Sequence, residues 1–381
     1  MVFQIKKFKI THFQNNNSTY ILKQTNKQTN KQTNKQTNKQ TNKIMKKISL
    51  LLIGLFLIPT LFLTSCDKGD DTLVDATPAF TLMKDYVINN NLDINKIITN
   101  TDNEKFVVGP PATAADVPAY IAKYTILDIR TTTAFAAGHI ESAKNIEFKN
   151  ILTEAAAATK PILVVCVTGQ TACYATALLR MYGYTHTKAL KWGMSGWNDA
   201  TAGAWNGKIG SNEADGHANW THEGAPSNNE FGDPVISTLA TNGETILKNQ
   251  IEKVVAAGFK TANSSDVLNN PNNYFINNYF SEAHYSGFGH IKGAHRILPL
   301  TLADNSYKGL DPTSGVKVVT YCYTGQTSAV VTACLNVLGY DAYSMTFGMN
   351  GLYNTNPFWN DPQIGNQWGA DSKPKNLPLV Q

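Results

Sequence analysis

The chain has 381 residues, with 33 Lys and Arg against 28 Asp and Glu, and a formal net charge of +5. Eleven lysines and none of the acidic residues fall in residues 1–65, so residues 66–381 carry 22 basic and 28 acidic side chains, a net of −6. This mildly acidic body gives no reason to expect nucleic acid as a partner, and its 316 residues suffice for two domains with ordinary cores.

The first 65 residues have the features of a segment that precedes the true start of translation, followed by an export signal. Residues 1–44 contain Lys-Gln-Thr-Asn in tandem from 23 to 42, a low-complexity pattern that cannot fold. Residues 45–65 begin with Met-Lys-Lys and continue as an apolar run, which predicts a signal peptide rather than a spanning helix. Because a signal peptide stands at the start of the translated product, we expect Met45 to be the true start and residues 1–44 not to be translated.

Residues 66–80 are a polar tether, and alternating helical and strand patterns then predict a first domain over residues 81–200. Taken in chain order, the patterns predict a helix at 81–98, a strand at 106–108, a helix at 112–123, a strand at 125–129, a helix around 155–158, a strand at 161–165 and a helix at 171–181. The strand at 161–165 is wholly apolar, which is typical of a parallel sheet buried on both faces.

A second domain is predicted over residues 235–360. Residues 201–234, rich in Gly, Asn and Ala, form a linker, and an amphipathic helix at 244–257 follows, with strands at 274–276 and 316–321. Residues 361–381 are predicted to be a polar tail. The expected fold class is α/β, with two domains that each have a mostly parallel sheet flanked by helices.

Three short motifs occur twice and in the same order. Gly-His-Ile stands at 138–140 and 289–291, Cys-x-Thr-Gly-Gln-Thr at 166–171 and 322–327, and Gly-Met-x-Gly at 193–196 and 348–351. The interval from the glycine of Gly-His-Ile to the cysteine is 28 residues in the first copy and 33 in the second. The interval from the cysteine to the first glycine of Gly-Met-x-Gly is 27 residues in the first copy and 26 in the second. The sequence therefore contains two copies of one domain, with five additional residues in the second copy.

Both loop cysteines follow a predicted strand and precede a predicted helix. The free N–H groups of a helix N-terminus favour thiolate over thiol, so we expect lower pKa values here than at Cys173 and Cys334, which lie inside the predicted helices. The loop glycine allows the backbone angles of a tight cradle, and the threonines add hydroxyl donors. The candidate site residues are Cys166, Val167, Thr168, Gly169, Gln170 and Thr171 in the first loop and Cys322, Tyr323, Thr324, Gly325, Gln326 and Thr327 in the second.

This order of motifs resembles the rhodanese-like sulfurtransferases. Their pattern is a strand ending in Asp-x-Arg, then Gly-His-Ile, a six-residue cysteine loop, a helix ending in Gly-Tyr, and finally Gly-Gly-x-Gly-Trp or Gly-Met-x-Gly-Trp. The resemblance covers roughly residues 105–200 and 255–355. The resemblance implies an enzyme without a cofactor. A sulfane sulfur would pass from a donor (thiosulfate, polysulfide or a persulfide) to Cys166 or Cys322, and on to a thiol or cyanide-like acceptor.

The supporting residues differ between the two copies. The resemblance implies that Asp128 and Arg130 tie together the loops around Cys166, whereas the second copy has Asn277 and Asn278 nearby and no Asp-x-Arg. We therefore expect the first copy to carry more of the activity. Many related domains have arginine at the sixth loop position, where this chain has threonine, which puts specificity for thiosulfate in doubt.

The sequence Leu-Thr-Ser-Cys at 63–66 resembles the cleavage site of bacterial lipoproteins. The resemblance implies that Cys66 is lipidated and that the protein is anchored to a membrane of the cell envelope, on the periplasmic or outer-membrane surface of a Gram-negative bacterium. The alternative is a plain signal anchor with an incidental cysteine.

The remaining candidates favour structural roles. Cys173 and Cys334 are expected to pack in the core, and His139 and His290 to pack at turns and donate to backbone carbonyls. No Cys-x-x-Cys or paired-histidine spacing suggests a metal. Two other functions compete with the enzyme: a non-catalytic module that binds or senses sulfur species or oxyanions, and a phosphatase of related fold. The phosphatase is disfavoured because no arginine follows the first loop until Arg180.

Overall fold

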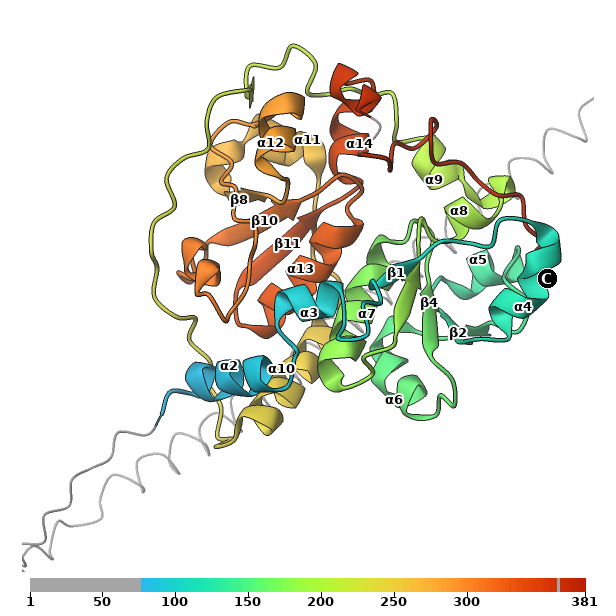
Figure 1. Ribbon diagram of the computed structural model, residues 1–381, viewed down its shortest axis with the longest axis horizontal. Helices are drawn as coiled ribbons and strands as arrows, with labels where there is room; N and C mark the ends of the chain where they lie inside the picture. Colours follow the sequence, from blue (N-terminus) through green and yellow to red (C-terminus); the bar gives the residue numbers. More distant parts are fainter. Residues whose placement is uncertain (1–76, 362–363) are drawn as a thin grey trace, which may run out of the picture. The chain divides into compact units, whose positions relative to one another are not determined.

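The computed structural model describes residues 77–361 and 364–381 (Figure 1). The expected signal peptide, Cys66 and most of the tether lie outside these residues. Within them, no helix is both long and apolar enough to cross a membrane.

The first sheet has five strands, all parallel, in the order β1-β5-β4-β2-β3. The central strand, β4, is Ile-Leu-Val-Val with every residue buried, as expected for a strand covered on both faces. The strands are β1 (Val107–Val108), β2 (Thr125–Asp128), β3 (Lys144–Asn145), β4 (Ile162–Val165) and β5 (Lys188–Leu190).

The second sheet repeats this plan with four parallel strands in the order β7-β11-β10-β8. Its register fixes the correspondence between the copies, because Asp128 pairs with Val165 in the first sheet and Asn278 pairs with Tyr321 in the second. The strands are β7 (Thr261–Ala262), β8 (Phe275–Asn278), β10 (Lys317–Tyr321) and β11 (Asp341–Met345); a separate antiparallel pair joins β6 (Trp220–Thr221) to β9 (His290–Ile291).

Helices cover the faces of both sheets. The first part of the described chain has α2 (Ala79–Asn89), α3 (Ile94–Ile98), α4 (Val117–Ile121), α5 (Thr132–Ala136), α6 (Ile151–Ala156), α7 (Gln170–Tyr182), α8 (Met194–Trp197) and α9 (Gly203–Asn206). The second part has α10 (Gly243–Ala257), α11 (Ser264–Asn269), α12 (Glu282–Phe288), α13 (Gln326–Val337) and α14 (Gly348–Tyr353).

The two copies share one hydrophobic core. Helix α7 packs on β4 and α13 on β10, and the two helices pack against each other (Figure 1). Both helices are buried around nearly their whole circumference, as expected for a helix held between a sheet and a second helix. Because each of these helices begins at a candidate cysteine loop, this packing also fixes the two loops relative to each other.

The N-terminal helices differ from the single helix predicted over 81–98. The chain breaks at Asn91, which has a left-handed φ of 56°, and Asp93 then caps α3 by accepting a hydrogen bond from the N–H of Ile94. The buried carboxylate of Asp93 also accepts from the N–H groups of Leu302 and Ala303, and α2 packs on α10. This N-terminal segment, which we assigned to the first domain, therefore contacts the second.

The expected linker and tail both contribute to the core. Trp205 from the linker and Trp368 from the tail are fully buried and contact Trp192 of the first domain. Farther along, Leu377 is buried beside α8, and Val380 forms an antiparallel bridge with His139. The C-terminus thus returns to the first domain, where Figure 1 shows it beside α4 and α5.

Candidate active site

The two candidate cysteines occupy equivalent places in the two sheets. Cys166 directly follows β4 and Cys322 directly follows β10, each an internal strand, at the edge of the sheet where parallel strands end. Each loop turns into its helix through a glycine with positive φ, 86° at Gly169 and 74° at Gly325, which is the region that glycine adopts without steric cost.

Backbone N–H groups donate to both sulfur atoms, two at Cys166 and one at Cys322. The Sγ atom of Cys166 accepts from the N–H groups of Gly169 at 3.1 Å and Ala172 at 3.3 Å. The Sγ atom of Cys322 accepts from the N–H of Ser328 at 3.3 Å and lies 3.6 Å from its hydroxyl. Such a cradle stabilises negative charge on sulfur, as the sequence indicated.

Burial acts against this stabilisation. Cys166 is only 5% exposed, and burial raises its pKa above the ordinary value, opposed by the N–H groups of the loop. The nearby Asp128 carboxylate acts in the same direction as burial. Burial raises the pKa of Cys173 well above its usual range and also raises that of Cys334. The cradle therefore does not lower the pKa of Cys166 below that of an ordinary thiol, although the order expected between Cys166 and Cys173 holds.

A second turn in each domain supports the loop from behind. In the first domain, the N–H groups of Met194 and Ser195 donate to the carbonyls of Cys166 and Val167 at 2.8 and 3.0 Å. The turn comes so close that a Cβ atom at Gly193 would lie 2.3 Å from the Cys166 carbonyl oxygen. This contact explains the Gly-Met-x-Gly motif of the sequence.

The second domain repeats the support. The N–H groups of Met349 and Asn350 donate to the carbonyls of Cys322 and Tyr323 at 2.9 and 3.0 Å. A Cβ atom at Gly348 would lie 2.1 Å from the Cys322 carbonyl oxygen. Both cysteine loops are thus held by the same backbone geometry.

Asp128 and Arg130 form a buried ion pair that ties together the loops around the first site. Arg130 donates from Nε and Nη2 to the Asp128 carboxylate at 2.7 to 3.0 Å, and from Nη1 and Nη2 to the carbonyls of Ala134 and Gly138. Both side chains are buried and neither touches the Cys166 sulfur through a hydrogen bond described here. Their geometry fits a supporting role.

The second domain replaces this ion pair with aromatic packing. By the register of β8 and β10, Asn278 stands where Asp128 stands, and Phe280, two residues on, stands where Arg130 stands. Phe280 stacks on Tyr323 of the cysteine loop, with ring centroids 4.3 Å apart. Asn277, which the sequence also offered, accepts from the N–H of Ile297 instead.

The surroundings of the two loops also differ, because the first loop is partly exposed and the second is buried among aromatic side chains. Val167 is 40% exposed at the first loop, beside the tryptophans already described, and Trp205 donates from Nε1 to the Thr168 carbonyl at 3.1 Å. Cys322 is only 2% exposed and lies in a cluster whose aromatic members are Trp220, Phe280, Tyr285, Phe288, Tyr323, Tyr353, Phe358 and Trp359.

The polar loop side chains mostly bond within the loops or across to the other domain. Thr168 accepts from Nε2 of Gln170, and Thr324 accepts from the N–H of Gln326. Thr171 and Thr327 are half-buried, and within the described residues the hydroxyl of neither makes a hydrogen bond. Thus two of the four expected hydroxyl donors act first as acceptors inside their own loops.

The predicted structural residues behave as expected. His139 donates from Nδ1 to the Phe135 carbonyl and His290 from Nδ1 to the Tyr285 carbonyl, which confirms the prediction of packed turn histidines. Burial lowers the pKa of His290 to about 4, so this ring is neutral at physiological pH. Cys173 and Cys334 are fully buried free thiols, which confirms core packing.

Sequence reasoning missed four groups that shape the sites: Trp205, Trp368, Phe280 and Ser328. The first two stand in segments without periodicity, where only the presence of tryptophan could have suggested burial. Ser328 could have been found by comparing the copies, because Ala172 holds its place in the first.

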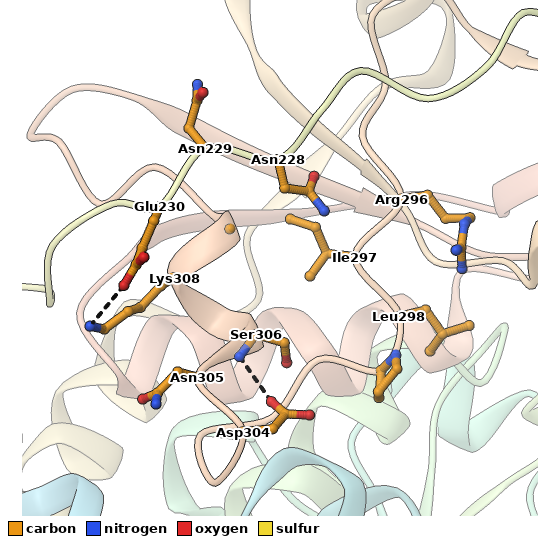
Figure 2. A pocket seen from close by; sticks show the side chains of 12 residues that line it. Asn228, Asn229, Glu230, Arg296, Ile297, Leu298, Asp304, Asn305, Ser306 and Lys308 are labelled. Carbon is orange, nitrogen blue, oxygen red and sulfur yellow. Dashed lines mark hydrogen bonds and ion pairs between the residues drawn. The ribbon is translucent and has the colours of Figure 1, made fainter.

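Four surface cavities occur in the part of the chain that the structure describes, and neither Cys166 nor Cys322 lines any of these four. The one in Figure 2 has a volume of about 610 Å³ and lies between the linker and residues 296–309. Its charged lining residues are two cations, Arg296 and Lys308, and two anions, Glu230 and Asp304, and Lys308 pairs with Glu230. Among residues 77–361 and 364–381, no group of His, Cys, Asp and Glu side chains is placed to hold a metal ion.

The fold and the paired loops define a protein with two similar α/β domains, each with a cysteine at the end of an internal parallel strand. Residues 113–200 and 277–355 both match the family model of the Rhodanese-like domain. Both segments are therefore similar to this family, and each contains one of the two candidate loops. No curated protein matches the chain.

Several solved structures are similar in part. A rhodanese-related protein from Thermoplasma volcanium is 23% identical over 23% of this chain and 85% of its own, with a TM-score of 0.20. A thiosulfate sulfurtransferase from Pseudomonas aeruginosa is 12% identical over 70% of this chain, which spans only 45% of that protein, with a TM-score of 0.24. A 3-mercaptopyruvate sulfurtransferase from Leishmania major is 14% identical over 64% and 73% of the two chains, also with a TM-score of 0.24.

Proposed function

We propose that the protein is a sulfurtransferase that carries a sulfane sulfur as a persulfide on Cys166 and Cys322. The observation that carries this proposal is that backbone N–H groups donate to the two sulfur atoms, two at Cys166 and one at Cys322, at the same place in two domains that match the Rhodanese-like family model. A thiolate at either position has its charge stabilised without a metal or a cofactor.

The reaction takes two displacement steps. In the first, the cysteine thiolate attacks the outer sulfur of the donor, a new S–S bond forms, and the donor's S–S bond breaks to release sulfite or a thiolate. In the second, a thiolate or cyanide attacks the outer sulfur of the cysteine persulfide, and the cysteine leaves as thiolate. Each step moves one sulfur atom and returns one electron pair to a leaving group, so no external oxidant or reductant is needed.

The choice of donor depends on charge. The loops hold threonine at the sixth position, and Arg130, which follows the neighbouring strand β2, is committed to Asp128 and two carbonyls. A dianionic donor such as thiosulfate therefore lacks a charge-assisted contact that would be worth roughly 1.5–3 kcal/mol. We infer that polysulfides or persulfides are better donors than thiosulfate.

The test is mass spectrometry of the purified protein after exposure to thiosulfate, polysulfide or cysteine persulfide. We expect an added sulfur that maps to Cys166 and Cys322, that is absent from the matching Cys→Ser variants, and that is removed by cyanide or a thiol. Cys173→Ser, which alters a buried thiol of the same helix, is the control and should load normally. Absence of added sulfur at both loop cysteines with all three donors would refute the function.

A turnover assay with the same donors, and with cyanide or a thiol as acceptor, ranks the two sites. Because Asp128 and Arg130 tie together the segments around the first site and Val167 of its loop is exposed, we expect Cys166→Ser to lose more turnover than Cys322→Ser. Retention of full turnover by Cys166→Ser would reverse the two roles.

A second candidate function is a module that binds or senses sulfur species without turnover. It is favoured by the near-complete burial of Cys322 beneath aromatic rings and by the raised pKa of Cys166. This candidate predicts that sulfur loads onto a cysteine but is not passed to cyanide or a thiol.

For location, we propose a lipid anchor at Cys66 that holds the protein at the cell envelope, periplasmic or on the outer-membrane surface. The support is the Leu-Thr-Ser-Cys sequence after a basic and apolar leader. Replacing Cys66 with alanine should release the protein from the membrane fraction, and unchanged membrane attachment would contradict the anchor.

A further inference from the structure

A reciprocal pair of hydrogen bonds joins the two cysteine loops. Gln170, the first residue of α7, accepts at Oε1 from the N–H of Phe347 at 2.8 Å. Gln326, the first residue of α13, accepts at Oε1 from the N–H of Trp192 at 3.1 Å. The two glutamines are only 3% and 4% exposed, so each side chain is buried where it crosses from its own domain into the other.

The N–H groups that these glutamines engage belong to the turns that support the cysteine loops. Trp192 precedes Gly193, whose turn holds the Cys166 carbonyl, and Phe347 precedes Gly348, whose turn holds the Cys322 carbonyl. Both aromatic residues have positive φ, 66° and 61°, a conformation that is costly for bulky side chains and persists only where the surroundings enforce it. The glutamine of one domain thus satisfies the strained turn of the other.

The Oε1 atoms of the glutamines also lie close to the glycines of the opposite loops. A Cβ atom at Gly169 would lie 2.9 Å from Oε1 of Gln326, and one at Gly325 would lie 2.3 Å from Oε1 of Gln170. Gly169 is the residue whose N–H donates to the Cys166 sulfur. One atom of Gln326 therefore contacts both the turn behind Cys166 and the loop glycine in front of it.

We propose that Gln170 and Gln326 are positioning residues that act across the domain interface, Gln326 on the Cys166 loop and Gln170 on the Cys322 loop. Each site is then complete only when the other domain is docked, and the two sites depend on each other through equivalent atoms. The inference rests on the proposed function only in taking Cys166 and Cys322 as the reacting groups.

A crossed effect distinguishes this role from general support of the interface. The interface has another buried hydrogen bond, from Nδ2 of Asn336 on α13 to the hydroxyl of Tyr174 on α7 at 3.2 Å, with no contact to either loop turn. If the glutamines only held the domains together, Tyr174→Phe would act on both cysteines as a glutamine variant does.

The experiment measures the alkylation rate of each loop cysteine by mass spectrometry over a range of pH, in the full chain, for Gln326→Met, Gln170→Met and Tyr174→Phe. Methionine keeps the length of the side chain and removes the acceptor. We expect Gln326→Met to slow labelling of Cys166 by roughly three- to tenfold, with a smaller change at Cys322, and Gln170→Met to do the opposite. Tyr174→Phe should change neither by more than about twofold.

If a methionine variant does not fold, as judged by thermal unfolding, the asparagine variant replaces it, because it keeps a buried amide but withdraws the acceptor by one methylene. Effects confined to the variant's own loop, or equal at both cysteines, would overturn the proposal. Because alkylation needs no sulfur donor, a chain that accepts no sulfane sulfur would refute the proposed function while the crossed pattern still reports on the glutamines.

Discussion

At the scale of single residues, the reactivity of each cysteine reflects a balance between burial and backbone hydrogen bonds. The N–H groups of Gly169 and Ala172 stabilise a thiolate at Cys166, but the almost complete burial of that sulfur penalises the charge more. The sequence could predict the N–H groups, because a strand, a glycine and a helix start are visible in it. It could not predict burial, which depends on the packing of the core that the two domains share and to which Cys166 belongs.

This balance gives a prediction for the pH dependence of labelling. Because the pKa of Cys166 lies above the ordinary thiol value of 9.0, the reactive thiolate is scarce at neutral pH, and its fraction rises about tenfold per pH unit up to that pKa. We expect the rate of iodoacetamide labelling at Cys166 to be still rising at pH 9, and labelling of Cys173 to follow only at higher pH. The measurement is a rate profile by peptide mass spectrometry, with Cys166→Ser as the control. A plateau below pH 9 would contradict it.

At the scale of elements, the sequence predicted most of what forms the sites. The repeated motifs identified both cysteine loops, and β4, α7, α10 and β10 lie within one or two residues of their predicted bounds. Local signals were enough because these elements have long apolar or amphipathic patterns. The single helix expected over 81–98 failed because Asp93 starts a new helix, a capping effect that periodicity does not record.

The short element α9 shows what local patterns could not predict. It carries Trp205, which holds the first loop through the Thr168 carbonyl and packs between Trp192, Trp368 and Phe347. These partners lie far apart along the chain, so their cluster becomes visible only in the folded structure.

Trp205 is therefore expected to matter for the loop as well as for stability. Trp205→Phe keeps an aromatic ring but removes the donor to Thr168, which should cost roughly 1–2 kcal/mol of unfolding free energy and slow sulfur loading at Cys166 while sparing Cys322. Trp197→Phe is the matched control, since its Nε1 donates to the Pro378 carbonyl away from the loop. Equal loading of Cys166 in both variants, measured by mass spectrometry beside urea unfolding, would contradict a role for Trp205 in the loop.

At the scale of the whole molecule, the two domains are not independent units. The packing of α7 on α13 joins their cores, Asp93 ties the N-terminal segment to the second domain, and the tail returns to the first. The reciprocal glutamines add a connection between the two cysteine loops themselves. The two similar domains thus pack as one body, in which the supports of the two sites differ: an ion pair at the first and aromatic stacking at the second.

This organisation predicts how the tail contributes to stability. Trp368 is fully buried against the tryptophans of the first domain although it follows the second in the sequence, and its Nε1 donates to Asn206 at 2.8 Å. Trp368→Ala should therefore lower the free energy of unfolding by about 3–5 kcal/mol. Because the core is continuous across the domains, we expect fluorescence and far-ultraviolet circular dichroism to report one shared transition in urea. Lys373→Ala, on a less buried part of the tail, should stay within about 0.5 kcal/mol of the unmodified protein. Two separated transitions, or an unchanged midpoint for Trp368→Ala, would show that the tail lies on the first domain without stabilising it.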